Sequence, residues 1–315
     1  MAGAASELPL VHARGLVKLF DELVAVDGID FDVQKGEAFG FLGPNGAGKT
    51  STMRMIGCVS PPSDGTLSIL GLDPIKDGAA IRARLGVGPQ QDTLDFELTV
   101  HENIVVYGRY FGLPRAELQR RADELLEFVQ LSERAHDKVE PLSGGMKRRL
   151  TIARSLINDP EVLLLDEPTT GLDPQARHTV WDRLFRLKQR GVTLILTTHY
   201  MDEAEQLCDR LVVMDKAKIV AEGSPLELIR RYSTREVVEL RFRADEEPSE
   251  FAARIDGLAR RLEALPDRLL LYTDDGDATA LRVHEIGVRP ESTLVRRSTL
   301  EDVFLHLTGR TLVDE

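Results

Sequence analysis

One stretch of eight residues constrains the fold of this 315-residue chain more than any other feature. It follows a short apolar run, residues 38–42, that is typical of a buried strand, and it opens a helical pattern that begins at Lys49. The stretch matches the pattern G-x-x-x-x-G-K-[ST] with Gly43, Pro44, Asn45, Gly46, Ala47, Gly48, Lys49 and Thr50, and Ser51 follows it. Backbone N–H groups of such a loop converge on phosphate oxygens, where the helix dipole also favours negative charge. The stretch therefore predicts an α/β fold with a phosphate-binding loop.

A second motif supplies the acidic groups that phosphate chemistry needs. Residues 162–165 form an apolar strand that ends in Asp166 and Glu167. Lys49 would reach the outer phosphates, and Thr50 and Asp166 would hold Mg²⁺. Glu167 would orient and deprotonate the attacking water. Together the two motifs predict nucleotide hydrolysis.

The rest of the first 230 residues predicts a mainly parallel sheet with two additions. Ile29, Phe31 and Val33 alternate with acidic residues, which indicates an antiparallel β portion near the start. Residues 98–157 are helical in pattern, and Thr99 with Glu102 fits a capping box at their beginning. The apolar runs 162–165 and 192–198 then return the chain to strand–helix–strand order.

A domain boundary is expected near residue 230. Ser224 and Pro225 are typical of a helix N-cap and first helical position, and we place the boundary after that helix begins. Short strand-like pieces at 237–242 and 269–272 alternate with amphipathic segments. The sequence therefore predicts a nucleotide-binding domain over 1–230, with a helical subdomain at about 98–157. A small α+β domain over 231–315 follows it.

The balance of charged residues indicates whether a nucleic-acid partner is to be expected. Acidic residues number 52 against 40 basic ones, so the formal net charge is -12. Because neutralising nucleic-acid phosphates needs a basic face, no nucleic-acid partner is expected. The densest cationic cluster, Lys147-Arg148-Arg149, is interpreted as a solvated helix face.

The two cysteines and the hydropathy pattern predict a location. Cys58 and Cys208 each lie in a predicted helix and are expected to be reduced thiols that fill the core. No stretch approaches the roughly 20 apolar residues that span a bilayer. We therefore expect a cytoplasmic protein.

Between the two phosphate motifs lies Leu142-Ser143-Gly144-Gly145-Met146, which resembles the LSGGQ signature of ABC ATPases. The resemblance covers about residues 10–230 and implies ATP and Mg²⁺ as cofactors. It also implies that Ser143, Gly144 and Gly145 bind the nucleotide held by a second subunit. Met146 departs from the usual Gln, which is expected to alter the rate without loss of phosphate binding.

The resemblance assigns four further residues. Gln90 is similar to the family's Q-loop glutamine, which touches metal and water and contacts the membrane subunit, although Gln91 beside it is an alternative. Asp173 lies in a segment that resembles the D-loop, and His199 resembles the switch histidine that senses the γ-phosphate. Phe20 stands where the family has an aromatic residue that stacks on adenine. A core position at a strand end is the alternative for Phe20, and Asp21-Glu22 after it replaces a common Gly.

Within the family, the chain looks most like the ATPases of drug-resistance and nodulation-factor exporters. This likeness rests on the runs 40–45, 142–149, 166–174 and 198–205, and on the closing run 298–304. It implies a motor subunit on the cytoplasmic face of the cell membrane that dimerises, pairs with an ABC-2-type integral permease and exports a drug-like or amphiphilic compound. The competing interpretations are a soluble ABC ATPase that acts on nucleic acid or ribosomes, and a nucleotide-binding regulator without turnover.

Overall fold

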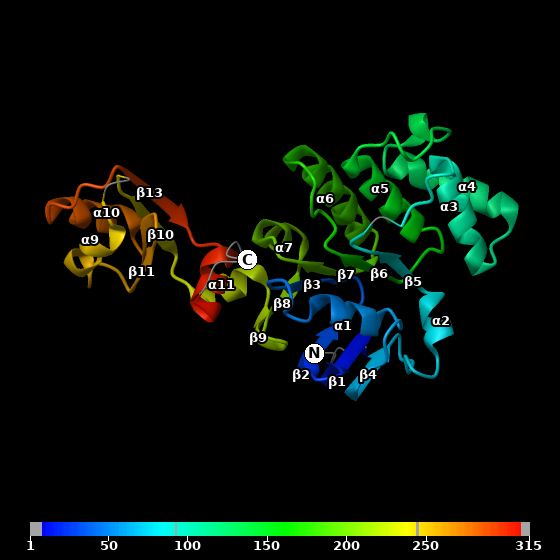
Figure 1. The fold of residues 1–315 in the computed structure, drawn as a ribbon, viewed down its shortest axis with the longest axis horizontal. Coiled ribbons are helices and arrows are strands. Elements are labelled where there is room, and N and C mark those ends of the chain that lie inside the picture. Colours follow the sequence, from blue (N-terminus) through cyan, green and yellow to red (C-terminus); the bar gives the residue numbers. More distant parts are fainter. Residues whose placement is uncertain (1–7, 92, 244–245, 310–315) are drawn as a thin grey trace, which may run out of the picture. The chain divides into compact units, whose positions relative to one another are not determined.

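The computed structural model describes residues 8–91, 93–243 and 246–309. The chain divides into two compact units, one up to Glu222 and one from Gly223 onward. Figure 1 gives the labels of helices and strands.

The first unit is built on a six-stranded sheet with the strand order β5-β6-β7-β3-β8-β9. Its strands are β3 (Ala38–Leu42), β5 (Leu85–Gly88), β6 (Val162–Asp166), β7 (Thr193–Thr198), β8 (Arg210–Asp215) and β9 (Lys218–Gly223). The pairs from β5 through β8 are parallel. The central strands β3 and β7 are buried along their whole length because both faces of the sheet are covered. The expected parallel buried sheet is confirmed.

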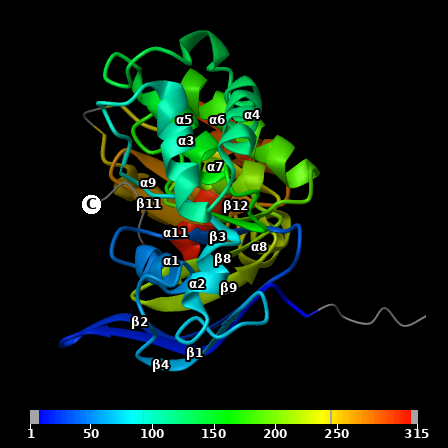
Figure 2. The same ribbon diagram turned by 90° about the vertical axis from the view of Figure 1, so that its right-hand side faces the viewer.

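An antiparallel sheet forms a second layer of the first unit. It has the order β2-β1-β4, with β1 at Val11–Phe20, β2 at Leu23–Val33 and β4 at Asp64–Ile69. Helix α1 (Lys49–Ile56) lies between this sheet and the larger one and contacts strands of both (Figure 2). Phe31 from β2 packs edge-on against Phe41 from β3 at 5.1 Å between ring centres, so one core joins the two layers.

Helices fill the rest of the first unit. They are α2 (Gly78–Arg82), α3 (Val100–Gly108), α4 (Arg115–Phe128), α5 (Gly144–Ser155), α6 (Pro174–Gln189) and α7 (Met201–Leu207), with short 3-10 turns at Arg109–Phe111 and Ser132–Arg134. The predicted helical subdomain corresponds to α3, α4 and α5, which share their own apolar core. Thr99 and Glu102 form the expected capping box at α3.

The second unit is a four-stranded antiparallel sheet with helices on both faces. Its elements are α8 (Pro225–Tyr232), β10 (Glu236–Arg241), α9 (Pro248–Ile255), β11 (Arg261–Leu265), β12 (Arg268–Thr273), α10 (Gly276–Glu285), β13 (Ser292–Arg297) and α11 (Leu300–Thr308). The strand order is β11-β12-β10-β13. Ser224 caps α8 as expected. Because α8 packs against α11, its contacts place it in the second unit, whereas the boundary drawn from sequence lies inside this helix.

Two local expectations were wrong. Cys58 lies in the turn after α1 with a left-handed φ of 53°, and Cys208 follows the last residue of α7, so neither is helical. Cys208 is buried and Cys58 half-buried, and both are free thiols. Among the described residues, every helix is too short or too polar to cross a bilayer.

Candidate functional site

The phosphate-loop pattern lies at the carboxyl end of β3, where ligands bind in open α/β sheets. Gly48 is the N-cap of α1 with φ 101°, and a Cβ there would lie 2.4 Å from the carbonyl oxygen of Ala25. A Cβ on Gly43 would lie 2.3 Å from the carbonyl oxygen of Met214. The loop therefore requires glycine at both positions, because any side chain would push it off the strands beside it.

A pocket of about 270 Å³ opens over this loop. Its walls are Phe20, Leu23, Val24, Ala25, Asn45, Gly46, Gly48, Lys49, Thr50, Ser51, Gln90 and Glu167. Seven of these residues come from the loop and its helix or from the carboxylate strand, and the rest from β1, β2 and the segment after β5. The fold thus brings together most of the residues that the sequence singled out.

Lys49 joins the loop to the carboxylate strand. Its ammonium donates hydrogen bonds to the carbonyl oxygens of Gly43 at 2.7 Å and Pro44 at 2.9 Å. The same Nζ lies 3.8 Å from Oε1 of Glu167, and only 4% of the Lys49 side chain is exposed. The cation is therefore held at the floor of the pocket, where an outer phosphate would sit between it and solvent.

Thr50 and Asp166 are placed to share a cation. The Thr50 hydroxyl donates to Oδ1 of Asp166 at 3.3 Å, and Thr197 from β7 donates to the same oxygen. Hydroxyl and carboxylate oxygens are the hard ligands that Mg²⁺ prefers, with phosphate oxygens and water completing its shell. The two side chains therefore fit a magnesium ion that arrives with its nucleotide.

Glu167 is the carboxylate that lines the pocket. It is 7% exposed, and its Oε2 accepts hydrogen bonds from Gln90 Nε2 at 2.9 Å and Thr170 Oγ1 at 3.0 Å. Its Oε1 lies 3.3 Å from His199 Nδ1. The imidazole is the largest influence that lowers the pKa of Glu167, and it outweighs burial, which raises that pKa. Glu167 is therefore an ionised carboxylate at neutral pH and able to accept a proton.

Glu167 also has a strained backbone. Its φ is 46°, in the left-handed region that a non-glycine residue occupies at a cost on the order of 1 kcal/mol. Its N–H donates to the carbonyl oxygen of Thr197 at 3.1 Å and to the Thr197 hydroxyl at 3.0 Å. Such strain persists only where the surrounding contacts enforce it.

The geometry favours one alternative at Gln90 and one at Phe20. Gln90 reaches Glu167, whereas exposed Gln91 lines a neighbouring groove. Phe20 is 42% exposed at the end of β1, so it is not a core residue. Its ring faces the pocket beside Leu23 and Val24, and Lys18 Nζ lies 4.9 Å from its centre. An aromatic ring with two exposed aliphatic neighbours forms an apolar wall of the kind that a purine base stacks on.

Sequence reasoning missed Leu23, Val24 and Ala25 in this wall. Leu23 and Val24 begin β2 directly after the turn at Asp21-Glu22 and are large apolar residues in an exposed strand end. The available signal was their position three to five residues after Phe20, the aromatic residue already assigned to the base.

The signature residues lie outside this pocket. Ser143 caps α5 and accepts a hydrogen bond from Met146 N at 3.3 Å. A Cβ on Gly145 would lie 2.7 Å from Cβ of Ala176, so α5 and α6 touch at this point. Asp173 caps α6 through the Ala176 N–H at 2.9 Å. None of these residues, nor Gly144, lines the wall around Lys49, so in one copy of the chain they contact no nucleotide bound there.

The basic run after the signature is not a solvated face. Arg148 is 5% exposed, and its guanidinium donates to the carbonyl oxygens of Pro168 at 2.7 Å, Asp166 at 3.0 Å, and Pro89. Arg149 is half-buried and donates to the carbonyl oxygen of Val129 at 2.7 Å. The expectation was wrong because both side chains point back from α5 onto buried backbone.

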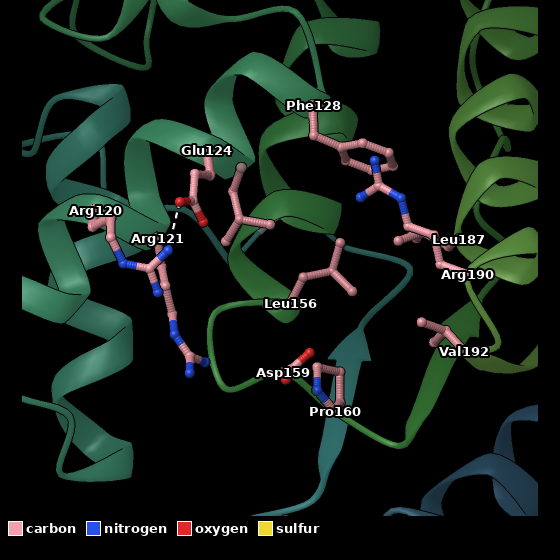
Figure 3. A pocket seen from close by; sticks show the side chains of 11 residues that line it. Arg120, Arg121, Glu124, Phe128, Leu156, Asp159, Pro160, Leu187, Arg190 and Val192 are labelled. Atoms are coloured by element: carbon pink, nitrogen blue, oxygen red, sulfur yellow. Dashed lines mark hydrogen bonds and ion pairs between the residues drawn. The ribbon is translucent and has the colours of Figure 1, made fainter.

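A larger pocket, of about 360 Å³, lies elsewhere in the first unit (Figure 3). It is bounded by α4 and by Pro160 and Val192, which precede β6 and β7. Arg190 covers the ring of Phe128 at 5.0 Å, and Arg120 pairs with Glu124. The starts of these strands are the opposite end from Asp166 and His199. The residues predicted to bind nucleotide thus converge on the smaller pocket.

Comparison with known proteins agrees with this geometry. Residues 26–170 match the family model described as ABC transporter, and residues 248–309 match the model of the C-terminal domain of the nodulation factor export protein NodI. The chain is 47% identical over 310 residues to the Nod factor export ATP-binding protein I of Ralstonia nicotianae, covering 97% of this chain and 96% of that protein. The chain belongs to the family of Nod factor export ATP-binding proteins, a group of ABC transporter ATPases.

Other members of this family and a solved structure extend the likeness. The Nod factor export ATP-binding protein I of Rhizobium sp. (strain N33) is 45% identical over 304 residues, with 96% of this chain and 98% of that protein covered. A dimeric ATP-binding cassette in a post-hydrolysis state, bound to ADP and phosphate, superposes with a TM-score of 0.62. It is 27% identical and covers 68% of this chain and 98% of that one.

Membership of the family establishes the coarse function. The chain is an ATP-binding subunit of an ABC exporter, and it hydrolyses ATP to drive export. The superposed ATP-binding cassette is a dimer. These relatives do not support the alternative interpretation, a soluble ABC ATPase that acts on nucleic acid or ribosomes.

Proposed function

We propose that two copies of this chain bind an ABC-2-type permease and hydrolyse Mg-ATP between them. This hydrolysis drives export of a Nod-factor-like lipochitooligosaccharide. The observation that carries the hydrolytic part is the convergence of three groups on Glu167. Gln90 at 2.9 Å, His199 at 3.3 Å and Lys49 at 3.8 Å surround one ionised carboxylate at the end of β6.

Each residue has a distinct task in this mechanism. The loop amides, Lys49 and Ser51 would hold the phosphates of ATP. Thr50 and Asp166, with Gln90 beside them, would hold Mg²⁺, which would neutralise charge on the phosphates. Glu167 orients the attacking water and takes its proton. His199, next to Glu167, donates to the γ-phosphate oxygens as their charge shifts. Phe20 stacks on adenine.

The signature residues supply the argument for a dimer. The N-terminus of α5 is formed by Ser143, Gly144 and Gly145, and helix N-termini are suited to binding anions. These residues do not line the pocket of their own copy. A head-to-tail dimer would place them, with Asp173, against the nucleotide of the partner subunit. ATP would then join the two copies, and its hydrolysis would release them.

The permease would dock in a groove of this chain beside the nucleotide. A groove of about 360 Å³ shares Thr50, Gln90 and Asp166 with the site. Val59, which is 73% exposed, Val87 and Met53 give it an apolar lining. A membrane subunit seated there would touch Gln90 directly, so its movement would reach Glu167 through one hydrogen bond.

The cargo is inferred from the relatives, which are named Nod factor export proteins at 45–47% identity over nearly the full chain. Their match includes the C-terminal domain over residues 248–309. We therefore propose an amphiphilic acylated oligosaccharide as the molecule exported.

The test is transport in inside-out membrane vesicles that contain this chain and an ABC-2-type permease from the same organism. We expect Mg-ATP to drive uptake of a lipochitooligosaccharide, and the Glu167→Gln variant to stop it. Hydrolysis that is stimulated by nucleic acid, or recovery of the chain from membranes without an integral partner, would contradict the proposal.

A further inference from the structure

Two buried ionisable side chains lie behind the catalytic strand end and have no role in the mechanism above. They are Arg148 on α5, five residues after Ser143, and Glu203 on α7, four residues after His199. Arg148 is 5% exposed and Glu203 is fully buried. Both contact the short segment that follows Glu167.

Arg148 holds this segment by its backbone. Its Nε donates to the carbonyl oxygen of Pro168 at 2.7 Å, and its Nη2 donates to that of Asp166 at 3.0 Å. Its Nη1 donates to the carbonyl oxygen of Pro89, the residue before Gln90. One guanidinium therefore fixes the backbone on both sides of Glu167 and the start of the glutamine loop.

Glu203 holds the same segment by a side chain. Its Oε1 accepts hydrogen bonds from Thr169 Oγ1 at 2.7 Å and from Trp181 Nε1 on α6 at 3.1 Å. Burial raises the pKa of Glu203, while hydrogen bonding to Thr198, Thr169 and Trp181 and the charge of Arg148 favour its ionised form. Burying a carboxyl costs stability, so packing alone gives no reason for it.

The segment matters because it sets the conformation of Glu167. Thr170, next to Thr169, donates from Oγ1 to Oε2 of Glu167 at 3.0 Å. Glu167 itself has the strained φ of 46°. If residues 168–170 relaxed, Glu167 would return to an ordinary backbone conformation and its carboxylate would leave the position between Gln90 and His199.

We propose that Arg148 and Glu203 are positioning residues of the ATPase reaction, which clamp residues 168–170 from two sides and so keep Glu167 in its strained, productive conformation. The inference rests on the proposed role of Glu167 as the base. It adds a connection between the signature helix α5 and the catalytic carboxylate of the same copy, because Arg148 lies on that helix.

The test uses the full chain and compares turnover with ATP affinity. Thr169→Val keeps the shape of a buried side chain and removes the hydrogen bond to Glu203. We expect it to lower kcat about 10-fold, and Glu203→Ala about 100-fold, since a displacement near 1 Å of a reacting group costs about that much. The Kd for ATP, measured by calorimetry, should stay within twofold. Glu203→Gln should recover most of the turnover lost in Glu203→Ala, because one amide oxygen can accept both hydrogen bonds.

Thr151→Val is the matched control. Thr151 is also a fully buried threonine, but its hydroxyl donates to the carbonyl oxygen of Lys147 within α5, at 3.0 Å. Its replacement should leave kcat unchanged. If Thr169→Val behaves like this control, or lowers ATP affinity as much as kcat, the clamp is refuted.

A double-mutant comparison separates positioning from general stability. In the Glu167→Gln background the catalytic carboxylate is already absent, so misplacing the side chain at 167 loses little further turnover. Thr169→Val should therefore not reduce the residual turnover. An equal reduction in both backgrounds would show that Thr169 acts independently of Glu167 and would overturn the clamp. Normal turnover in Glu167→Gln alone would instead overturn the proposed function, and the two failures are thus distinguishable.

Discussion

Replacing Lys49 by Ala removes the cation that the structure places at the floor of the nucleotide pocket. Its Nζ lies 2.7 and 2.9 Å from two loop carbonyl oxygens and 3.8 Å from Glu167 Oε1, so it is held at a fixed point before any phosphate arrives. A hydrogen bond to a charged group contributes about 1.5–3 kcal/mol. At about 1.4 kcal/mol per factor of ten, the Kd for ATP should rise about 10- to 150-fold.

The fold should survive this change. The two carbonyl oxygens that lose Lys49 are buried, but truncating a side chain that lines the pocket opens its floor, so water can enter and replace the ammonium. We would measure ATP binding by calorimetry and unfolding by circular dichroism, with Lys35→Ala as the control because it removes the same charge from an exposed turn. An ATP affinity in Lys49→Ala equal to that of the control would refute the assignment of the loop.

Two further predictions follow from the same geometry. The pKa of Glu167 lies below its ordinary value of 4.5, so its ionisation stabilises the folded state above about that pH, and this contribution is lost as pH falls through the folded pKa. Urea unfolding of wild type and Glu167→Gln between pH 3 and 6 should show the steeper loss in wild type, and parallel curves would be contrary evidence. A chain that ends after Gly223 should fold and bind ATP like the full chain, because the site lies wholly within the first unit. A cut after Tyr232 leaves α8 without α11 and should expose Leu228, so lower solubility than the shorter form is expected by light scattering.

The sequence was most informative where function depends on neighbouring residues in one stretch. The loop Gly43–Thr50 and the strand end Asp166-Glu167 require particular residue types at fixed spacing, because strand, turn and helix geometry leave little choice. Their positions in the structure agree with that interpretation. The capping residues Thr99 and Ser224 are similar cases, since each acts within its own first turn.

The sequence was least informative where a role depends on tertiary burial. Arg148 is part of a basic run that looks like an exposed helix face, and only the packing of α5 against the strand ends buries it. Glu203 looks like one more acidic residue on a polar helix, yet it accepts a hydrogen bond from Trp181 of another helix. Leu23 and Val24 reach the nucleotide pocket through the pairing of β1 with β2, and the sequence signal for this was their place three and four residues after Phe20.

The central claim is that ATP bound at Lys49 of one copy is closed over by Ser143 of the other. Light scattering of Glu167→Gln in Mg-ATP tests it most directly, because hydrolysis, the release step, falls about 10²- to 10⁴-fold in that variant. A ligand that binds the closed form alone stabilises that form. The account predicts an ATP-dependent dimer for Glu167→Gln and its loss in the Glu167→Gln, Ser143→Arg double variant. A monomer in both variants, or a dimer that persists with arginine at position 143, would contradict it.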